Sequence, residues 1–575
     1  YMGALPAWWP QVGVAIALAA LVVWSFVQRW NVLSASPFPL GVDGYFYPVQ
    51  LRSLLETGEL QYPASPLAFW LMAPFAAATD PITGAKLGAA VLGALIALPA
   101  YAVGAQLGRD GDERGRGAGL IAAVLATTSA GSMYMTIEFV KNGIGLTVAM
   151  TALWLVLRAL EVPTRRRTIV AILGIVAAVL THKMAAGIVI GIAIPAALVE
   201  THQRGKLRWR RALPIGIALG VLGVLVLIGV AMPRRFLSPA DLALLDNMFT
   251  TEADWSLPAL GGKLTFGYEP AIGAVLAIAA SWALLDDKRS TRGRLLVVGR
   301  VLQCVGVMMA LGAIAIGGGA IAGGIVGGGL VLVAGGLLLR RWAGRMLGAS
   351  LRAHAGAGRD VAAWCALALA AVISLPWLDA THSQGLAMRL RVIAFVPMAL
   401  CAAIVFRVIG RYAARMFDGD RRPPPAAFGV VIAIAIVAIR AGGGPQTEGQ
   451  VVTHPALIAS VQAAVGKIPD GGVAVVQERH IAFMFAWYAQ VPISMRPEPF
   501  APERRYRVMP LAFIQIGSAL DASLLSARDQ AELRVIGLHP LHPNGMVIVP
   551  EATWQVILAR LSPFDRMRLD AWPTI

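Results

Sequence analysis

The sequence predicts a polytopic α-helical membrane protein that ends in an extracytoplasmic α/β domain. Of its 575 residues, 57% are hydrophobic and only 14% are charged, whereas soluble globular domains are about 25% charged. Apolar runs close to or above the roughly 18 residues that can cross a bilayer recur from Val12 to Ala441. After Gly442 this pattern gives way to short strand-like and helix-like segments. These observations exclude a soluble enzyme, a disordered chain and a single membrane anchor.

Thirteen apolar runs are expected to cross the membrane. The expected spans are 11–28, 85–107, 118–133, 143–160, 169–181, 184–200, 212–231, 271–285, 296–316, 318–339, 361–378, 392–407 and 426–441. A further run, 66–79, is short and bounded by prolines, so we interpret it as an interfacial helix.

The positive charges support this count. With the first residue in the cytoplasm, the inner loops hold 27 Lys and Arg in 87 residues, and the outer segments hold 10 in 121. This asymmetry has the direction that the positive-inside rule requires. Counting 66–79 as a span would invert every later loop and place the arginines at 165–167 outside.

An odd number of spans divides the chain into a membrane domain, 1–441, and an extracytoplasmic soluble α/β domain, 442–575. The tail is expected to contain two buried strands and two helices, at Gly472–Gln477, Gly545–Pro550, Val451–Val465 and Glu551–Leu561. The composition, rich in Ala, Gly and Arg, favours a GC-rich bacterial source. We therefore expect the plasma (inner) membrane of a bacterium.

The outer segments contain the candidate site, because an integral-membrane enzyme gathers its ionisable residues at one face or in a polar cavity. The first outer loop, 29–84, carries Asp43 ahead of Tyr45 and Tyr47, whose rings suit a sugar or a lipid headgroup. Within this loop Val49–Thr57 has the pattern of a helix in the membrane interface. An Asx-turn is the structural alternative for Asp43.

The next two outer segments add a second group of polar residues. Glu138, Lys141 and Asn142 lie between the third and fourth spans, where Glu138 and Lys141 could instead pair at a helix end. His182 and Lys183 form the following outer turn, where a snorkelling lysine beside a capped histidine is the alternative.

Two later outer segments carry further arginines. Arg389 and Arg391 lie in an outer segment, where the positive-inside rule disfavours arginine. Their presence there favours a functional role, although they could also mark a span boundary. The segment 232–270 is 39 residues long, and loops of this length are often lids over a substrate. Its candidate substrate contacts are Arg234, Arg235, Asp246, Asp254 and Trp255.

This arrangement resembles the GT-C superfamily of integral-membrane glycosyltransferases, which includes oligosaccharyltransferases, protein O-mannosyltransferases and aminoarabinose transferases. The resemblance lies in the long first outer loop with its early Asp43, and in the Pro-containing segment Tyr62–Leu67 that leads to the second span. It implies a polyprenyl-phosphate or -pyrophosphate sugar donor and an active-site acid at Asp43, with Glu138 at the second acidic position. Asp43 is followed by Gly44 rather than a second acid, and the tail shows no WWD-type motif.

In this interpretation Asp43 is the general base that activates an acceptor hydroxyl or amide, and Glu138 is the second catalytic residue. The candidate ligands of the donor phosphate are Lys141, His182, Lys183, Arg389 and Arg391. The expected sugar or acceptor contacts are Tyr45, Tyr47 and Asn142. Alternatively, Asp43 and Glu138 together bind a divalent metal, Mg²⁺ or Mn²⁺, through oxygen ligands. The expected partners are a polyprenyl-phosphate sugar lipid, a glycan, lipid or protein acceptor, and membrane lipids.

Other classes of protein stay open at this point. A transporter or flippase of lipid-linked sugars would show repeats or midplane charges, and a non-catalytic scaffold would tolerate loss of Asp43. A ligase or polymerase of surface polysaccharide would differ only in its acceptor. The net charge of +17 does not indicate nucleic-acid binding, because the 49 Lys and Arg cluster between apolar runs. In the tail, Trp487 and Tyr488 could contact the acceptor or be structural.

Overall fold

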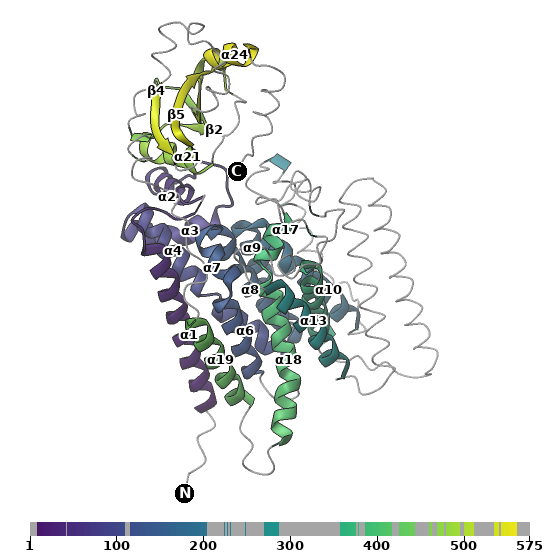
Figure 1. Ribbon diagram of the computed structural model, residues 1–575. Helices are drawn as coiled ribbons and strands as arrows, with labels where there is room; N and C mark the ends of the chain where they lie inside the picture. The colour runs from purple at the N-terminus through teal and green to yellow at the C-terminus, as the bar shows by residue number, and fades with distance from the viewer. Residues whose placement is uncertain are drawn as a thin grey trace. The chain divides into compact units, whose positions relative to one another are not determined.

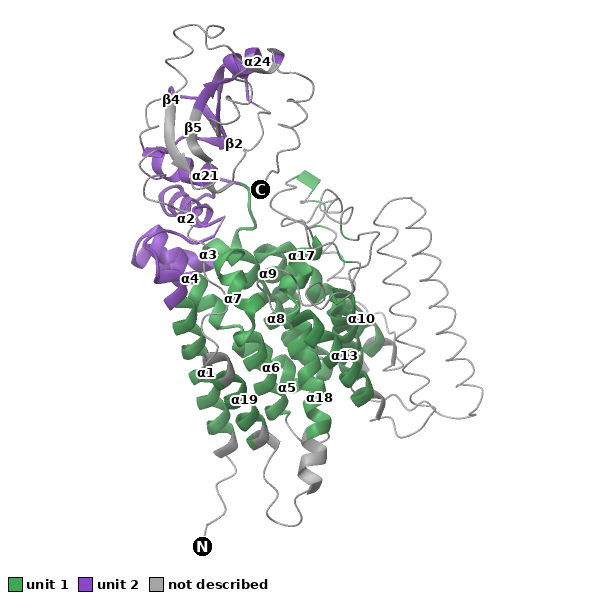
Figure 2. Ribbon diagram, in the orientation of Figure 1, with its two compact units in different colours: residues 1–30, 63–70, 89–447 green, residues 31–62, 71–88, 448–575 purple. Residues whose placement is uncertain are grey.

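The fold is taken from a computed structural model of the chain (Figure 1). Apart from a few isolated positions, it describes residues 9–41, 43–109, 115–203, 269–286, 357–374, 386–416, 425–442, 468–476, 479–494, 500–510, 534–539 and 542–560. The chain forms two compact units, which are coloured in Figure 2. Unit 1 contains residues 1–30, 63–70 and 89–447, and unit 2 contains 31–62, 71–88 and 448–575.

Unit 1 is largely helical. Its helices are α1 (Trp9–Ser34, as far as residue 30), α5 (Ala97–Leu107), α6 (Arg116–Thr128), α7 (Ala130–Ile137), α8 (Val140–Glu161), α9 (Arg165–Thr181), α10 (Lys183–Gln203), α13 (Glu269–Asp286), α16 (Ala357–Ile373), α17 (Leu386–Val392), α18 (Phe395–Met416) and α19 (Pro425–Gly442). The helices α3 (Leu67–Ala78) and α4 (Pro81–Ala94) belong partly to each unit.

Several of these helices are long and apolar enough to cross a membrane. Among the described residues there are four, Gln11–Ser34, Pro81–Leu107, Val140–Glu161 and Lys183–Glu200, or up to six if two bent helix pairs each form one span. The prediction of a polytopic helical membrane protein is thereby confirmed. The predicted spans at 296–316 and 318–339 lie outside the described residues.

Small residues allow the helices of unit 1 to approach closely. A Cβ atom at Gly429 on α19 would lie 2.4 Å from the Cα of Gly117 on α6, and one at Gly104 on α5 would lie 2.5 Å from the Cβ of Ala122 on α6. The core of the unit is rich in buried alanines. Backbone proximity of this kind is how apolar helices gain packing energy where lipid is the competing neighbour.

The predicted span 118–133 is broken in the structure. The helix α6 stops at Thr128, and α7 starts at Ala130 with its axis bent by 46°. Ser129 has an extended backbone, and its hydroxyl accepts a hydrogen bond from the N–H of Ser132 at 2.9 Å. The new helix start is stabilised further by Glu269, whose buried carboxylate accepts the N–H groups of Ala130 at 2.6 Å and Gly131 at 3.1 Å.

A second break lies beside the first. The helices α17 and α18 are bent by 41° across Ile393 and Ala394, inside the predicted span 392–407. The start of α7 packs against this break, because a Cβ at Gly131 would lie 2.2 Å from the carbonyl oxygen of Val392. The two broken spans, α6–α7 and α17–α18, therefore contact each other at their breaks.

Unit 2 combines residues 31–62 and 71–88 with the C-terminal part of the chain. The first of these segments contains α2 (Phe46–Thr57), which begins three residues before the predicted helix. The C-terminal elements are β1 (Val473–Val476), α21 (Arg479–Met484), the π-helix η3 (Phe485–Ala489), β2 (Ile493–Ser494), the 3₁₀ helix η4 (Pro502–Arg504), β3 (Arg505–Pro510), β4 (Arg534–His539), β5 (His542–Pro550) and α24 (Glu551–Arg560).

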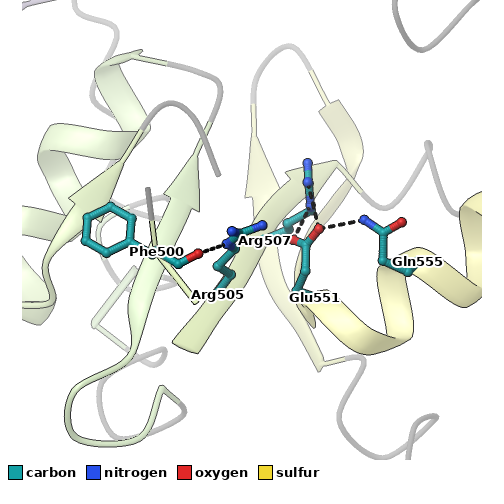
Figure 3. A network of polar contacts seen from close by, with 5 residues as sticks. All are labelled: Phe500, Arg505, Arg507, Glu551 and Gln555. Carbon is teal, nitrogen blue, oxygen red and sulfur yellow. Dashed lines mark hydrogen bonds and ion pairs between the residues drawn. The ribbon is translucent and has the colours of Figure 1, made fainter. Parts of the chain in front are cut away.

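The five strands form one mixed sheet in the order β2-β1-β3-β5-β4. The strand β1 pairs in parallel with β2 and β3, while β5 runs antiparallel to β3 and β4. An ion pair fixes α24 to the sheet: Arg507 donates from Nε and Nη2 to the Glu551 carboxylate at 2.7 and 3.0 Å, and Gln555 donates to it at 2.7 Å (Figure 3). In the same view Arg505 donates to the carbonyl of Phe500.

Candidate functional site

Asp43 lies in a tight turn that leads into α2. The N–H of Gly44 donates to the carbonyl of Gly41 at 3.1 Å, and the N–H of Phe46 donates to the carbonyl of Asp43 at 3.0 Å. Gly41 has a φ of 81°, in the region that glycine enters without strain. A Cβ at Gly44 would lie 2.7 Å from the carbonyl oxygen of Leu40. The turn that carries Asp43 thus depends on two glycines.

The two tyrosines after Asp43 are buried in unit 2. Tyr45 is 3% exposed and Tyr47 is 4% exposed. The hydroxyl of Tyr45 lies 2.8 Å from that of Tyr488, and the rings of Phe46 and Tyr47 pack edge to face with centroids 5.5 Å apart. Contacts of Tyr45 and Tyr47 with a sugar stay a prediction.

Glu138, Lys141 and Asn142 lie at the junction of α7 and α8. Glu138 caps the C-terminus of α7, and its N–H donates to the carbonyl of Tyr134 at 2.8 Å. Lys141 and Asn142 belong to the first turn of α8, where Asn142 is buried and Lys141 is partly buried. The break at Ser129 is therefore separated from the predicted acid, Glu138, only by the short helix α7.

Four of the predicted phosphate ligands gather in unit 1. His182 occupies the turn between α9 and α10 and is partly buried. Burial, together with the nearby charges of Lys141, Arg389 and Lys183, holds the pKa of His182 well below its usual value of 6.5. The cations come from the separate helices α8, α17 and α10. We call these four residues the cation cluster.

The imidazole of His182 is packed tightly at this position. A Cβ at Gly145 on α8 would lie 2.5 Å from the Cβ of His182, so the glycine makes room for it. The Nδ1 atom of His182 is buried and makes no hydrogen bond to the residues that the structure describes. The histidine is thus neutral at pH 7 and surrounded by positive charge, an environment that favours an anion.

Arg391, the fifth predicted phosphate ligand, is also buried. It lies on α17 with Arg389, and its Nη2 donates to the carbonyl of Leu378 at 3.1 Å. Asp43 belongs to unit 2, whereas Glu138 and all five predicted phosphate ligands belong to unit 1. Within the described ranges, no group of three or more His, Cys, Asp or Glu could hold a metal ion. Metal binding by Asp43 and Glu138 stays a prediction.

Two buried charges near α7 were not among the predicted site residues. Arg29 on α1 is fully buried and donates to the hydroxyls of Thr136 at 3.1 Å and Ser132 at 2.6 Å. The sequence placed Arg29 in the first outer loop, but α1 continues to Ser34. Glu269 was visible only as an acid before a proline at the start of an apolar run, which is a helix-start signal.

The remaining candidates fall largely outside the described residues. The predicted lid, 232–270, is described only at Met248 and from Glu269 onward, so Arg234, Arg235, Asp246, Asp254 and Trp255 lie outside it.

No protein-family model and no curated protein match the chain. The chain is similar to the crystal structure of ArnT from Cupriavidus metallidurans bound to undecaprenyl phosphate, with 16% identity, a TM-score of 0.44 and coverage of 94% of this chain and 98% of that one. The apo structure of the same protein matches with 13% identity, a TM-score of 0.43 and coverage of 96% and 99%.

Proposed function

We propose that this chain is a GT-C-like glycosyltransferase. It would move a sugar from a polyprenyl-phosphate or -pyrophosphate donor to an acceptor hydroxyl or amide on the outer face of a bacterial plasma membrane. The observation that carries the proposal is the cation cluster, in which Lys141, Lys183 and Arg389 lie close enough to His182 to lower its pKa. These three like charges come together from three separate helices of an apolar chain, and such a concentration of positive charge favours an anionic ligand such as a lipid phosphate.

The charge of the cluster suits the leaving group of such a reaction. A sugar phosphate breaks its glycosidic bond as negative charge grows on the phosphate oxygen. Two opposite unit charges 4 Å apart interact by about 4 kcal/mol at an effective dielectric near 20, so one or two cations suffice to stabilise that charge. Cations that are already in place need no reorganisation during the reaction.

The proposed step balances as a substitution at the anomeric carbon. Asp43 takes the proton of the acceptor hydroxyl, and the acceptor oxygen forms a bond to the anomeric carbon. The bond from that carbon to the phosphate oxygen breaks, and its electron pair stays on the polyprenyl phosphate, beside the cation cluster. Glu138 is the second catalytic residue. In the alternative that includes a metal, Asp43 and Glu138 hold Mg²⁺ or Mn²⁺.

The proposed topology follows from the charge asymmetry of the loops. Thirteen spans, with the first residue in the cytoplasm, place Asp43, Glu138 and the residues after 442 on the extracytoplasmic side. The acceptor would be a glycan, a lipid or a protein.

Binding of a lipid phosphate tests the role of the cluster. We would reconstitute the full chain in nanodiscs and compare undecaprenyl phosphate with undecaprenol, which has the same chain and no phosphate. The substitutions Lys141→Met and Arg389→Met should each weaken phosphate binding at least tenfold, which corresponds to about 1.4 kcal/mol. Arg165→Met, at the start of α9 and outside the cluster, is the control. Equal affinity for the phosphate and the alcohol would contradict the proposal.

Turnover tests the role of Asp43. With a panel of polyprenyl-phosphate sugars, Asp43→Asn should lower the release of polyprenyl phosphate by about 10²–10⁴-fold and leave undecaprenyl phosphate binding unchanged. Wild-type turnover in this variant would rule out Asp43 as the base. Translocation of the donor across vesicles without release of polyprenyl phosphate would instead support a flippase. Loss of turnover with a chelator, reversed by Mg²⁺ or Mn²⁺, would support the metal alternative.

A further inference from the structure

The first outer segment packs against the C-terminal part of the chain within unit 2. The ring of Phe46 lies 4.9 Å from that of Phe483 between centroids, and the ring of Tyr62 lies 5.8 Å from it. Phe46 and Phe483 are both buried. Aromatic pairs at such distances contribute about 0.5–1.5 kcal/mol beyond the area they bury. These contacts therefore hold α2 against α21.

A hydrogen-bonded arginine extends this contact to η3. Arg52 on α2 donates to the carbonyl of Ala486 at 2.9 Å and to the carbonyl of Trp487 at 3.1 Å, and its guanidinium lies 4.6 Å above the Trp487 ring. The carbonyl groups in the last turn of a helix lack partners within the helix, so a cation is well placed there. The helix ends at Ala489 and is followed by Gln490, which has a φ of 52°.

Tyr488 in η3 reaches the turn that carries Asp43. Its hydroxyl lies 2.8 Å from that of Tyr45, and the two rings have centroids 5.4 Å apart. Tyr45 is two residues from Asp43 and almost fully buried. The turn between them is tied by two backbone hydrogen bonds, from the N–H of Phe46 to the carbonyl of Asp43 at 3.0 Å and from the N–H of Gly44 to the carbonyl of Gly41 at 3.1 Å, so a movement of Tyr45 passes to Asp43.

We propose that Tyr488 is a positioning residue for Asp43, so that η3 of the C-terminal region holds the catalytic turn of the first outer loop in place. This inference rests on the proposed function, in which Asp43 is the base. It gives the C-terminal region a part in catalysis that requires no contact with substrate. Burial raises the pKa of Tyr488 above its ordinary value, although the hydrogen bond with Tyr45 opposes the shift. The phenol therefore stays neutral and the contact persists at physiological pH.

Removal of one hydroxyl tests the inference. Tyr488→Phe keeps the ring packing and should lower kcat about tenfold with little change in KM, since small misplacements of a catalytic group can cost up to about 100-fold. Tyr45→Phe should have the same effect. The double variant should be no worse than either single variant, because both remove one contact.

A matched control is Tyr506→Phe, which removes a hydroxyl from β3 of the same unit. The measurements are steady-state turnover with polyprenyl-phosphate sugars, the melting temperature of each variant, and hydrogen exchange of the peptide that covers residues 40–47. Exchange there should become faster in Tyr488→Phe and stay unchanged in Tyr506→Phe. If Tyr488→Phe keeps the wild-type kcat and the wild-type rate of exchange, as Tyr506→Phe should, Tyr488 does not position Asp43.

The Asp43→Asn background separates this inference from the proposed function. There the residual activity should not fall further when Tyr488→Phe is added, because the group being positioned is gone. A further tenfold loss would show that Tyr488 acts elsewhere and would overturn the inference. Wild-type activity in Asp43→Asn alone would overturn the base assignment, and with it the catalytic role of Tyr488.

Discussion

Replacement of Glu269 by alanine should loosen the start of α7. The carboxylate is 1% exposed and accepts two backbone N–H groups, from Ala130 and Gly131. Each buried donor left without an acceptor costs about 1–3 kcal/mol, and the charge at the helix N-terminus contributes about 0.3–1 kcal/mol more. The sum is about 2–7 kcal/mol, and because water can replace part of the lost bonding we expect about 2–4 kcal/mol.

Hydrogen exchange of the full chain in detergent measures this loss locally. The peptide that covers residues 129–138 should exchange faster in Glu269→Ala, and Glu269→Gln, which keeps one acceptor oxygen, should lie between it and the wild type. Glu200→Ala is the matched control: Glu200 is also buried and accepts the N–H of Gly358 at 2.6 Å, at the start of α16. Unchanged exchange at 129–138 in Glu269→Ala would refute the reasoning.

Two predictions concern pH. His182 has a lowered pKa in the folded state, so the unfolded chain binds more protons below pH 6.5 and the folded state loses stability there. His182→Gln should show a smaller drop in melting temperature between pH 7 and 5, and an identical drop would contradict the assignment. Glu551 changes the stability in the same direction but at lower pH: burial opposes its ionisation, but Arg507 and Gln555 lower its pKa below the usual value of 4.5. Its stabilisation is present above that pH and lost below it, so the melting temperatures of wild type and Glu551→Gln should converge on acidification.

The helices that the sequence predicted most closely are those with uninterrupted apolar patterns. The predicted spans 143–160 and 184–200 correspond to α8 and α10. In the tail, the predicted helix Glu551–Leu561 is found as α24, and the predicted strand Gly472–Gln477 is found as β1. In these segments the local pattern of apolar residues is sufficient to predict the helix or strand, because each element is buried either on one face or on all of its faces.

The two breaks in the predicted spans differ in how far local sequence indicates them. The run 118–133 contains no proline, and its interruption at Ser129 depends on Glu269, which is 139 residues from Ala130 in the sequence. The break before Phe395 also packs against Gly131 of a distant helix, but it has a local signal, because Pro397 cannot donate a hydrogen bond to the carbonyl of Ile393. At Ser129 a tertiary contact overrides a continuous apolar pattern.

The sequence predicted which residues of the expected outer segments form the candidate site, but it did not predict how these residues are arranged in space. The sequence could not show that Lys141, Lys183 and Arg389 surround one histidine, because that depends on how α8, α10 and α17 pack. Nor could it show that Tyr45 is buried against Tyr488, which lies 443 residues away. The boundary at 441/442 and the chemical roles of the site residues stay predictions.

The packing of α2 against the C-terminal part of the chain has a consequence for the order of synthesis. At about 5–20 residues per second, a ribosome needs roughly 20–90 s to travel the 443 residues from Tyr45 to Tyr488. During that interval α2 has emerged, but the rings and carbonyls that it will contact do not yet exist. The Asp43 turn is therefore among the last parts of the protein to be completed, and a nascent chain already inserted in the membrane would not yet hold Asp43 in place.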